Sequence, residues 1–128
     1  MNSNSRYERG QRALAQIDGE AGQVVIDSLA DIAPDLARYV IEFGFGDIYS
    51  RPGLDLRSRE VATIAALTAM GNARPQLKVH INAGLNVGLS QQEIVETIMQ
   101  MAVYAGFPAA LNGISAAREV FSERPVAA

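Results

Sequence analysis

Apolar residues recur along most of this chain at steps of three and four, the spacing that gives a helix one buried face. The stretch 76–88 shows the pattern clearly, because Leu77, Ile81, Gly84 and Leu85 form one stripe. No segment alternates apolar and polar residues as a half-buried strand does, and no segment is repeated. The pattern therefore predicts an all-α protein, a compact bundle of six or seven helices.

The first half of the chain is expected to hold three helices, over residues 6–17, 24–32 and 34–43. The glycine-containing stretch 18–22 separates the first two. Pro34 suits the first turn of the third helix, because a residue in that turn needs no N–H partner. Gly44 and Gly46 are expected to loosen the end of this helix, and the sequence Ser-Arg-Pro-Gly at 50–53 predicts a turn.

The second half is expected to hold four helices, over residues 56–70, 75–87, 91–105 and 109–123. The boundary before residue 91 is the most secure, because Ser90 and Glu93 match a capping box, in which each side chain satisfies a backbone N–H near the other residue. Pro125 is expected to stop the last helix.

The predicted helix over residues 91–105 has almost no polar face beyond Glu93, Glu96 and Gln100, so it is expected to be buried on several sides. The 128 residues fit one domain, predicted over 6–124, with a disordered N-terminus at 1–5 and a loose tail at 125–128. A domain of this size has little material to cover such a helix. Association of subunits is therefore expected, and a compact monomer with a well-filled core is the alternative.

Charge and composition exclude several classes of function. A formal net charge of -3 without a basic stripe argues against nucleic acid as a partner. No apolar run is long enough to span a bilayer and no export signal is visible, so no membrane partner and a cytoplasmic location are expected. The sequence has no cysteine, which excludes thiol chemistry, and one histidine without a visible carboxylate cluster, so no metal site is expected.

That single histidine, His80, lies at the margin of the apolar stripe in 76–88. An imidazole in such a place can exchange protons near neutral pH, or it can be a hydrogen-bonded structural residue. Glu60 shares a helix face with Ile64 and Leu67, and partial burial there would suit it to proton transfer. The alternative for Glu60 is a structural one, in which it complements the helix dipole or pairs with a nearby arginine (Arg57 or Arg59).

Three cations near these segments are candidates to hold a carboxylate group of a substrate: Arg51, Arg74 and Lys78. Most such residues on a protein surface are only solvated. Tyr49 and Tyr104 are expected to pack with their hydroxyl groups at the rim of the core.

Four stretches of the chain together resemble the carboxymuconolactone decarboxylase family: Tyr-Ser-Arg-Pro-Gly-Leu-Asp at 49–55, Gln-Leu-Lys-Val-His at 76–80, Ala-Gly-Leu-Asn-Val-Gly at 83–88 and Ala-Val-Tyr-Ala-Gly-Phe-Pro-Ala-Ala-Leu-Asn at 102–112. The similarity runs from Arg6 to Phe121, nearly the whole chain. The resemblance implies an all-helical protein that assembles as rings, often trimers paired into hexamers.

The alkyl hydroperoxidase branch of this family carries Cys-x-x-Cys before its histidine. Ala73 and Gln76 stand at those two positions here, so a cysteine-based peroxidase mechanism is excluded. Glu60 stands where that branch places an acid beside its thiols. The decarboxylases often have a short polar residue at that position, and commonly a cysteine where Ala105 stands.

The resemblance to the decarboxylase branch implies a cofactor-free decarboxylation of 4-carboxymuconolactone, or a closely related unsaturated lactone acid, as in the protocatechuate arm of the β-ketoadipate pathway. It implies His80 as proton donor or enolate stabiliser, Glu60 as the group that tunes it, and Arg51 or Arg74 as the cation that holds a carboxylate. The alternatives are an enzyme of the same fold acting on a different small acid or lactone, and a non-catalytic oligomer that binds a small acid.

Overall fold

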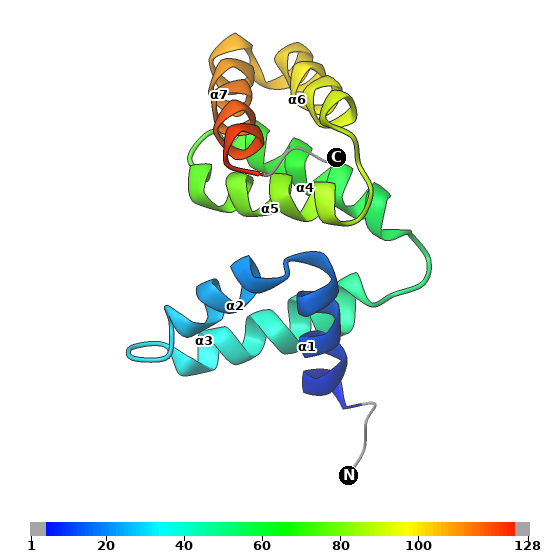
Figure 1. Cartoon of the computed structure of the whole chain (residues 1–128), viewed down its shortest axis with the longest axis vertical. Coiled ribbons are helices and arrows are strands. Elements are labelled where there is room, and N and C mark those ends of the chain that lie inside the picture. The colour runs from blue at the N-terminus through cyan, green and yellow to red at the C-terminus, as the bar shows by residue number, and fades with distance from the viewer. Residues whose placement is uncertain (1–4, 125–128) are drawn as a thin grey trace. The chain divides into compact units, whose positions relative to one another are not determined.

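The computed structural model of the chain describes residues 5–124, and that part holds seven α-helices, one π-helical segment and no strand (Figure 1). The all-α prediction is confirmed. The residues group into two compact units, Met1–Leu56 and Arg57–Ala128, and each is described by itself below. The single domain over 6–124 stays a prediction, and the predictions for residues 1–4 and 125–128 lie outside the described residues.

The first unit is built from α1 (Arg6–Ile17), α2 (Glu20–Asp27), α3 (Pro34–Tyr39) and the π-helical segment η1 (Val40–Tyr49). Helix α1 begins where the Ser5 side chain accepts a hydrogen bond from the Glu8 N–H at 3.1 Å, which satisfies one of the free N–H groups of the first turn. Helix α1 packs along η1, the main contact between elements in this unit.

Two glycines explain how closely α1 and η1 pack. A Cβ on Gly10 would overlap the backbone carbonyl of Ile41, and a Cβ on Gly46 would overlap the backbone carbonyl of Arg6. Each helix therefore needs a residue without a side chain where its backbone meets the other. Alanine at either position would force the two elements apart.

The helix bounds predicted in this unit are wrong at two places. The second helix was expected over 24–32, but α2 begins at Glu20 and ends at Asp27. Gly22 lies inside α2 and does not break it. The backbone of Gly22 packs against the side chain of Leu14, which leaves no room for a Cβ. The third helix does not end near residue 43, since α3 continues directly into η1 as far as Tyr49.

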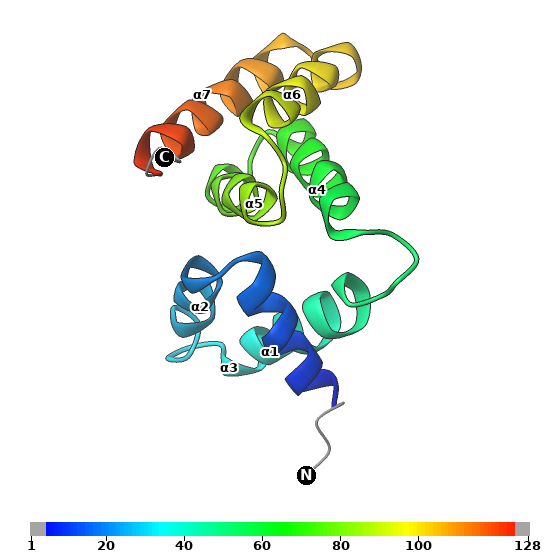
Figure 2. The same ribbon diagram turned by 45° about the vertical axis from the view of Figure 1, so that its right-hand side comes forward.

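The second unit consists of α4 (Leu56–Met70), α5 (Arg74–Asn86), α6 (Gln91–Ala105) and α7 (Phe107–Glu123). Helices α6 and α7 lie side by side, and α7 also packs on α5 (Figures 1 and 2). Their buried side chains form one core, which contains Ile64, Leu77, Ile81, Leu89, Ile94, Ile98, Ala116, Ala117 and Val120.

Predicted bounds in this unit agree closely with the structure. Helices α4 and α6 have the expected ends, and the capping box between Ser90 and Glu93 is present with both hydrogen bonds. Helix α7 begins at Phe107 and not at residue 109, because Pro108 is accommodated in its first turn, where no N–H partner is needed.

Burial of α6 on several sides, expected together with subunit association, stays a prediction, because the described residues of one chain cover only part of this helix. Its fully buried residues are Ile94 and Ile98, on one side. Large apolar side chains remain exposed at its C-terminal end and at the start of α7, and Tyr104, expected to pack, is 83% exposed. We call the set Met99, Val103, Tyr104, Phe107 and Leu111 the α6–α7 apolar face. None of the helices in residues 5–124 is long and apolar enough to span a membrane.

Candidate active site

His80 and Glu60 meet in the interior of the second unit. His80 belongs to α5 and Glu60 to α4, and the distance between His80 Nδ1 and Glu60 Oε1 is 2.9 Å. The side chain of Glu60 is fully buried and that of His80 is 17% exposed. The pair therefore joins a carboxyl group that water does not reach to an imidazole that lies at the edge of the core.

The local sequence of both helices explains this placement. The buried residues of α4 are Glu60, Ile64 and Thr68, which recur every four residues, so Glu60 lies on the core face of its helix. On α5 the buried residues include Leu77 and Ile81, and His80 lies beside that stripe. Glu60, a polar residue in the apolar stripe of α4, thus contacts His80, a polar residue beside the apolar stripe of α5.

Burial of Glu60 has a free-energy cost that the contact with His80 only partly offsets. Its second oxygen, Oε2, is also buried and has no hydrogen-bond partner within residues 5–124. A buried polar atom without a partner costs about 1–3 kcal/mol, and such atoms are rare in native structures unless a functional role explains them. This arrangement therefore contributes little to the stability of the fold, which marks the pair as a candidate functional site.

The contact also fixes the chemistry of the imidazole. A carboxylate beside Nδ1 favours the tautomer with hydrogen on Nδ1, orients the ring and stabilises the positive charge of the imidazolium. The pair can therefore take up or release a proton without reorganising its surroundings. Positioned acid–base groups of this kind raise reaction rates by about 10²–10⁴-fold.

One of the structural alternatives for Glu60, an ion pair with Arg57, is not formed. Arg57 pairs with Glu93 instead, with 2.6 Å between its Nη2 and Glu93 Oε2. Glu93 is the acidic member of the capping box at the start of α6, so Arg57 links the starts of α4 and α6.

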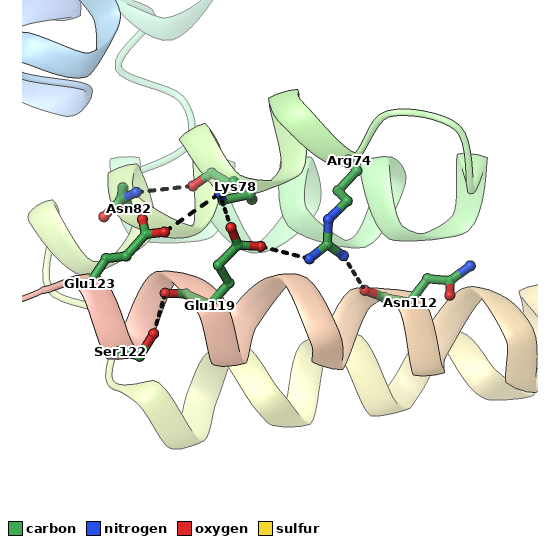
Figure 3. Close-up of polar contacts among 7 residues, drawn as sticks. All are labelled: Arg74, Lys78, Asn82, Asn112, Glu119, Ser122 and Glu123. Carbon is green, nitrogen blue, oxygen red and sulfur yellow. Dashed lines mark hydrogen bonds and ion pairs between the residues drawn. The ribbon is translucent and has the colours of Figure 1, made fainter.

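The predicted substrate cation Arg74 lies on the side of α5 that faces α7 (Figure 3). Its Nη2 lies 2.7 Å from Glu119 Oε2, and its Nη1 donates to the backbone carbonyl of Asn112 at 3.5 Å. Arg74 precedes His80 by six residues, a rotation of about 240° around the helix. The structure therefore places Glu60 beside His80, whereas Arg74 binds residues of α7.

Lys78 belongs to the same network as Arg74 (Figure 3). Its Nζ lies 2.8 Å from Glu119 Oε1 and 3.8 Å from Glu123 Oε1. The hydrogen bond from Lys78, followed by that from Arg74, holds the pKa of Glu119 below its usual value, and the same contact raises the pKa of Lys78. We call these four residues the α5–α7 ion network.

The other predicted substrate cation, Arg51, belongs to the first unit. It lines a pocket of about 450 Å³ between one face of α1 and the segment 49–56. Arg9 and Arg12 line the same pocket. These two arginines were not among the cations predicted from the sequence to hold a substrate carboxylate. Their spacing of three residues on one helix face was visible, but the segment that closes the pocket follows about 40 residues later.

Within residues 5–124, no three histidine, cysteine, aspartate or glutamate side chains gather as they would around a metal ion. The sequence model of the Carboxymuconolactone decarboxylase family matches residues 34–119. The chain belongs to this family. The match includes Glu60, His80 and Arg51, whereas Arg9 and Arg12 lie before it.

Three curated proteins are similar to the chain. A 4-carboxymuconolactone decarboxylase of Acinetobacter baylyi is 33% identical, over 99% of this chain and 95% of that protein. An uncharacterized 15.0 kDa protein of Paracoccus denitrificans is 34% identical over 75% of this chain and 72% of its own length. A nitrosuccinic acid decarboxylase of Metarhizium robertsii is 26% identical over 66% of this chain and 58% of its own length. Two of the three are named as decarboxylases.

Proposed function

We propose that this protein is a carboxy-lyase that decarboxylates 4-carboxymuconolactone, or a closely related unsaturated lactone acid, to an enol-lactone. The observation that carries the proposal is the buried contact between Glu60 and His80, an acid–base pair inside a chain of the decarboxylase family. The near full-length similarity to a 4-carboxymuconolactone decarboxylase supports the choice of substrate.

The reaction makes three demands on the protein. The bond between a carbon of the lactone and its carboxylate breaks, CO2 leaves, and the electron pair enters the conjugated lactone as an enolate. One proton must then be added to carbon. The unsaturated lactone is its own electron sink, so the protein has to hold the carboxylates, stabilise the enolate and supply the proton.

In this proposal His80 donates the proton or a hydrogen bond to the enolate. Glu60 holds Nδ1, so the imidazole exchanges its proton with the substrate through Nε2 and keeps one orientation throughout. Glu60 also balances the charge of the imidazolium. Arg51 holds a carboxylate of the substrate, whereas Arg74 would first have to leave Glu119.

The test is to mix the purified protein with 4-carboxymuconolactone and to follow the loss of lactone absorbance and the release of CO2. Turnover that His80→Ala removes is expected. A protein that is folded and assembled, yet gives no rate above a heat-treated control, would contradict the proposal. Peroxide reduction with a dithiol donor serves as a second control and is expected to be absent, because the sequence has no cysteine.

The similarity to nitrosuccinic acid decarboxylase favours one alternative, an enzyme of the same fold that acts on a different small acid. The same assay with a panel of small carboxylic acids distinguishes the two: release of CO2 from another acid, but not from the lactone, would establish the alternative. Tight binding of an acid without any release of CO2 would instead identify a non-catalytic binding protein.

We also propose that the chain forms a homo-oligomer, a trimer or a hexamer. The support is the α6–α7 apolar face, whose five large side chains are each more than half exposed within the chain. Light scattering is expected to give a multiple of 13.7 kDa, and Val103→Lys is expected to reduce it while circular dichroism stays helical. A wild-type protein that is monomeric at micromolar concentration would contradict this.

A further inference from the structure

The pocket of about 450 Å³ in the first unit combines two walls from distant parts of the chain. One wall is a face of α1 on which Arg9, Arg12 and Gln16 follow each other at helical spacing. The other is the segment 49–56, where the chain turns after η1 and which carries Arg51. This second wall contains the Tyr-Ser-Arg-Pro-Gly-Leu-Asp stretch found in the sequence analysis.

The pocket is positively charged although the unit is acidic. Residues 1–56 carry five arginines and nine aspartate or glutamate side chains. Three of the five arginines line the pocket, but only one of the nine carboxyl side chains, Asp55, does so. The lining therefore carries a formal charge of +2 in a unit whose net charge is -4. Such a concentration of one sign attracts anions.

The arginines of α1 are available to a ligand to different degrees. Arg12 makes no side-chain hydrogen bond or ion pair within residues 5–124. Arg9 has an ion pair with Asp47 at 3.7 Å, but Asp47 is bound more closely by Arg6, at 2.7 Å. The Arg6 hydrogen bonds are the main reason that the pKa of Asp47 is below its usual value. Arg12 is therefore the arginine of α1 that is more available to a ligand.

The remaining lining sets the shape of a fitting ligand. Leu54, which is exposed, and Leu56, which is partly exposed, provide apolar surface beside the guanidinium groups. Each guanidinium offers a planar fork of N–H donors that fits a carboxylate. An anion with an apolar body and two carboxylates matches both the lining and its charge of +2.

We infer that Arg9 and Arg12, together with Arg51, bind the two carboxylates of a small dicarboxylic acid in this pocket. The inference deepens the proposed function and rests on it in one respect, since it takes Arg51 as a substrate ligand. It adds two binding residues that precede the stretch matched by the family. Both residues belong to the first unit and are proposed to bind carboxylate groups only.

The experiment measures binding of a dicarboxylate that cannot react. Adipate is titrated into the full-length protein by calorimetry, with hexanoate (one carboxylate) and adipamide (none) as matched probes. Adipate is expected to bind best, and Arg12→Gln and Arg9→Gln are each expected to raise its Kd by about tenfold. Arg38→Gln is the control, because Arg38 pairs with Asp35 and Glu42 outside the pocket.

The result that would overturn the inference is adipate binding by Arg12→Gln with the wild-type Kd, or equally tight binding of hexanoate and adipamide. Absence of saturable adipate binding by the wild type at millimolar concentration would also overturn it. Arg12→Lys keeps the charge but loses the fork, and an intermediate Kd is expected. Thermal melts of each variant establish that it is folded.

The lactone assay separates this inference from the proposed function. Adipate binding that depends on Arg12, in a protein without lactone turnover, would support the dicarboxylate pocket and contradict the decarboxylase. Turnover of the lactone with a KM that Arg12→Gln and Arg9→Gln leave unchanged would support the decarboxylase and contradict the pocket.

Discussion

Helix α5 makes two contacts of opposite character with its neighbours. Toward α4, His80 meets Glu60 in a contact from which water is excluded on the side of the carboxyl group. Toward α7, Arg74 and Lys78 meet Glu119 in the α5–α7 ion network, where every partner is at least 28% exposed. The two contacts have similar lengths, between 2.7 and 2.9 Å.

The difference between them lies in the surroundings and not in the geometry. The network is open to water, so its charges are solvated with or without their partners, and such pairs contribute little to stability. Glu60 has one partner and a buried oxygen without any. A buried group depends on its partner far more strongly, because the partner replaces the water that it has lost. The comparison predicts that substitutions of His80 or Glu60 have large effects on turnover. Substitutions in the α5–α7 ion network are expected to have small effects.

The largest effect is expected from His80→Ala. If the imidazole transfers the proton, turnover falls by about 10²–10⁴-fold. Lys78→Gln, on the other side of the same helix, is the matched control and should retain activity. Kinetics must be given per folded subunit, because His80→Ala leaves Glu60 buried without its partner and lowers the melting temperature as well. Full activity in a folded His80→Ala protein would remove His80 from the mechanism.

A second effect, smaller than the first, is expected from Glu60→Gln. The amide keeps the shape of the side chain but carries no charge, so it no longer favours the imidazolium form of His80. Turnover should fall by about tenfold, less than the 10²–10⁴-fold expected for a group that itself transfers the proton, and the pH profile of turnover should move toward lower pH. A profile that stays in place, measured on a variant with normal melting behaviour, would show that Glu60 does not tune His80.

The sequence predicted those features of the site that depend on neighbouring residues. It did not predict those that depend on contacts between distant segments. The start of α6 was predicted correctly, because the capping box between Ser90 and Glu93 is a local signal. The core face of Glu60 could be seen from the spacing of residues on its own helix. Its pairing with His80 was expected only from the resemblance to the family, since 20 residues separate them and periodicity within a helix does not say which helices adjoin.

Two further features escaped prediction for the same reason. The π-helical segment η1 has no distinctive residue spacing, and the role of Gly46 depends on Arg6, 40 positions earlier. Arg74 was recognised as a cation near the site, but Glu119, which engages it, lies 45 residues later. Charge type is readable from a sequence, whereas the partner of a charge is a property of the packing.

The third prediction concerns stability and separates it from activity. Glu60→Leu replaces a buried carboxyl group that lacks a partner at Oε2 with an apolar side chain of similar size. His80 loses its partner but is partly exposed, so water can reach it. The free energy of unfolding is expected to stay the same or to rise, by up to about 1–4 kcal/mol, while turnover falls. A loss of stability as large as that of His80→Ala, in chemical denaturation, would show that the pair holds the fold together.

The smallest effect is expected from Glu119→Gln, which breaks the α5–α7 ion network. Because Lys78 and Arg74 lower the pKa of Glu119 in the folded protein, its charge stabilises the fold above the ordinary glutamate pKa of 4.5, and this contribution is lost as the pH falls through the lower, folded value. The melting temperatures of wild type and variant should therefore differ slightly at pH 7 and converge in strong acid. High salt should reduce the difference at pH 7, since the network is exposed to solvent. A difference that persists unchanged in acid and in salt would mean that Glu119 acts through packing and not through its charge, and that the two sides of α5 are less different than their burial implies.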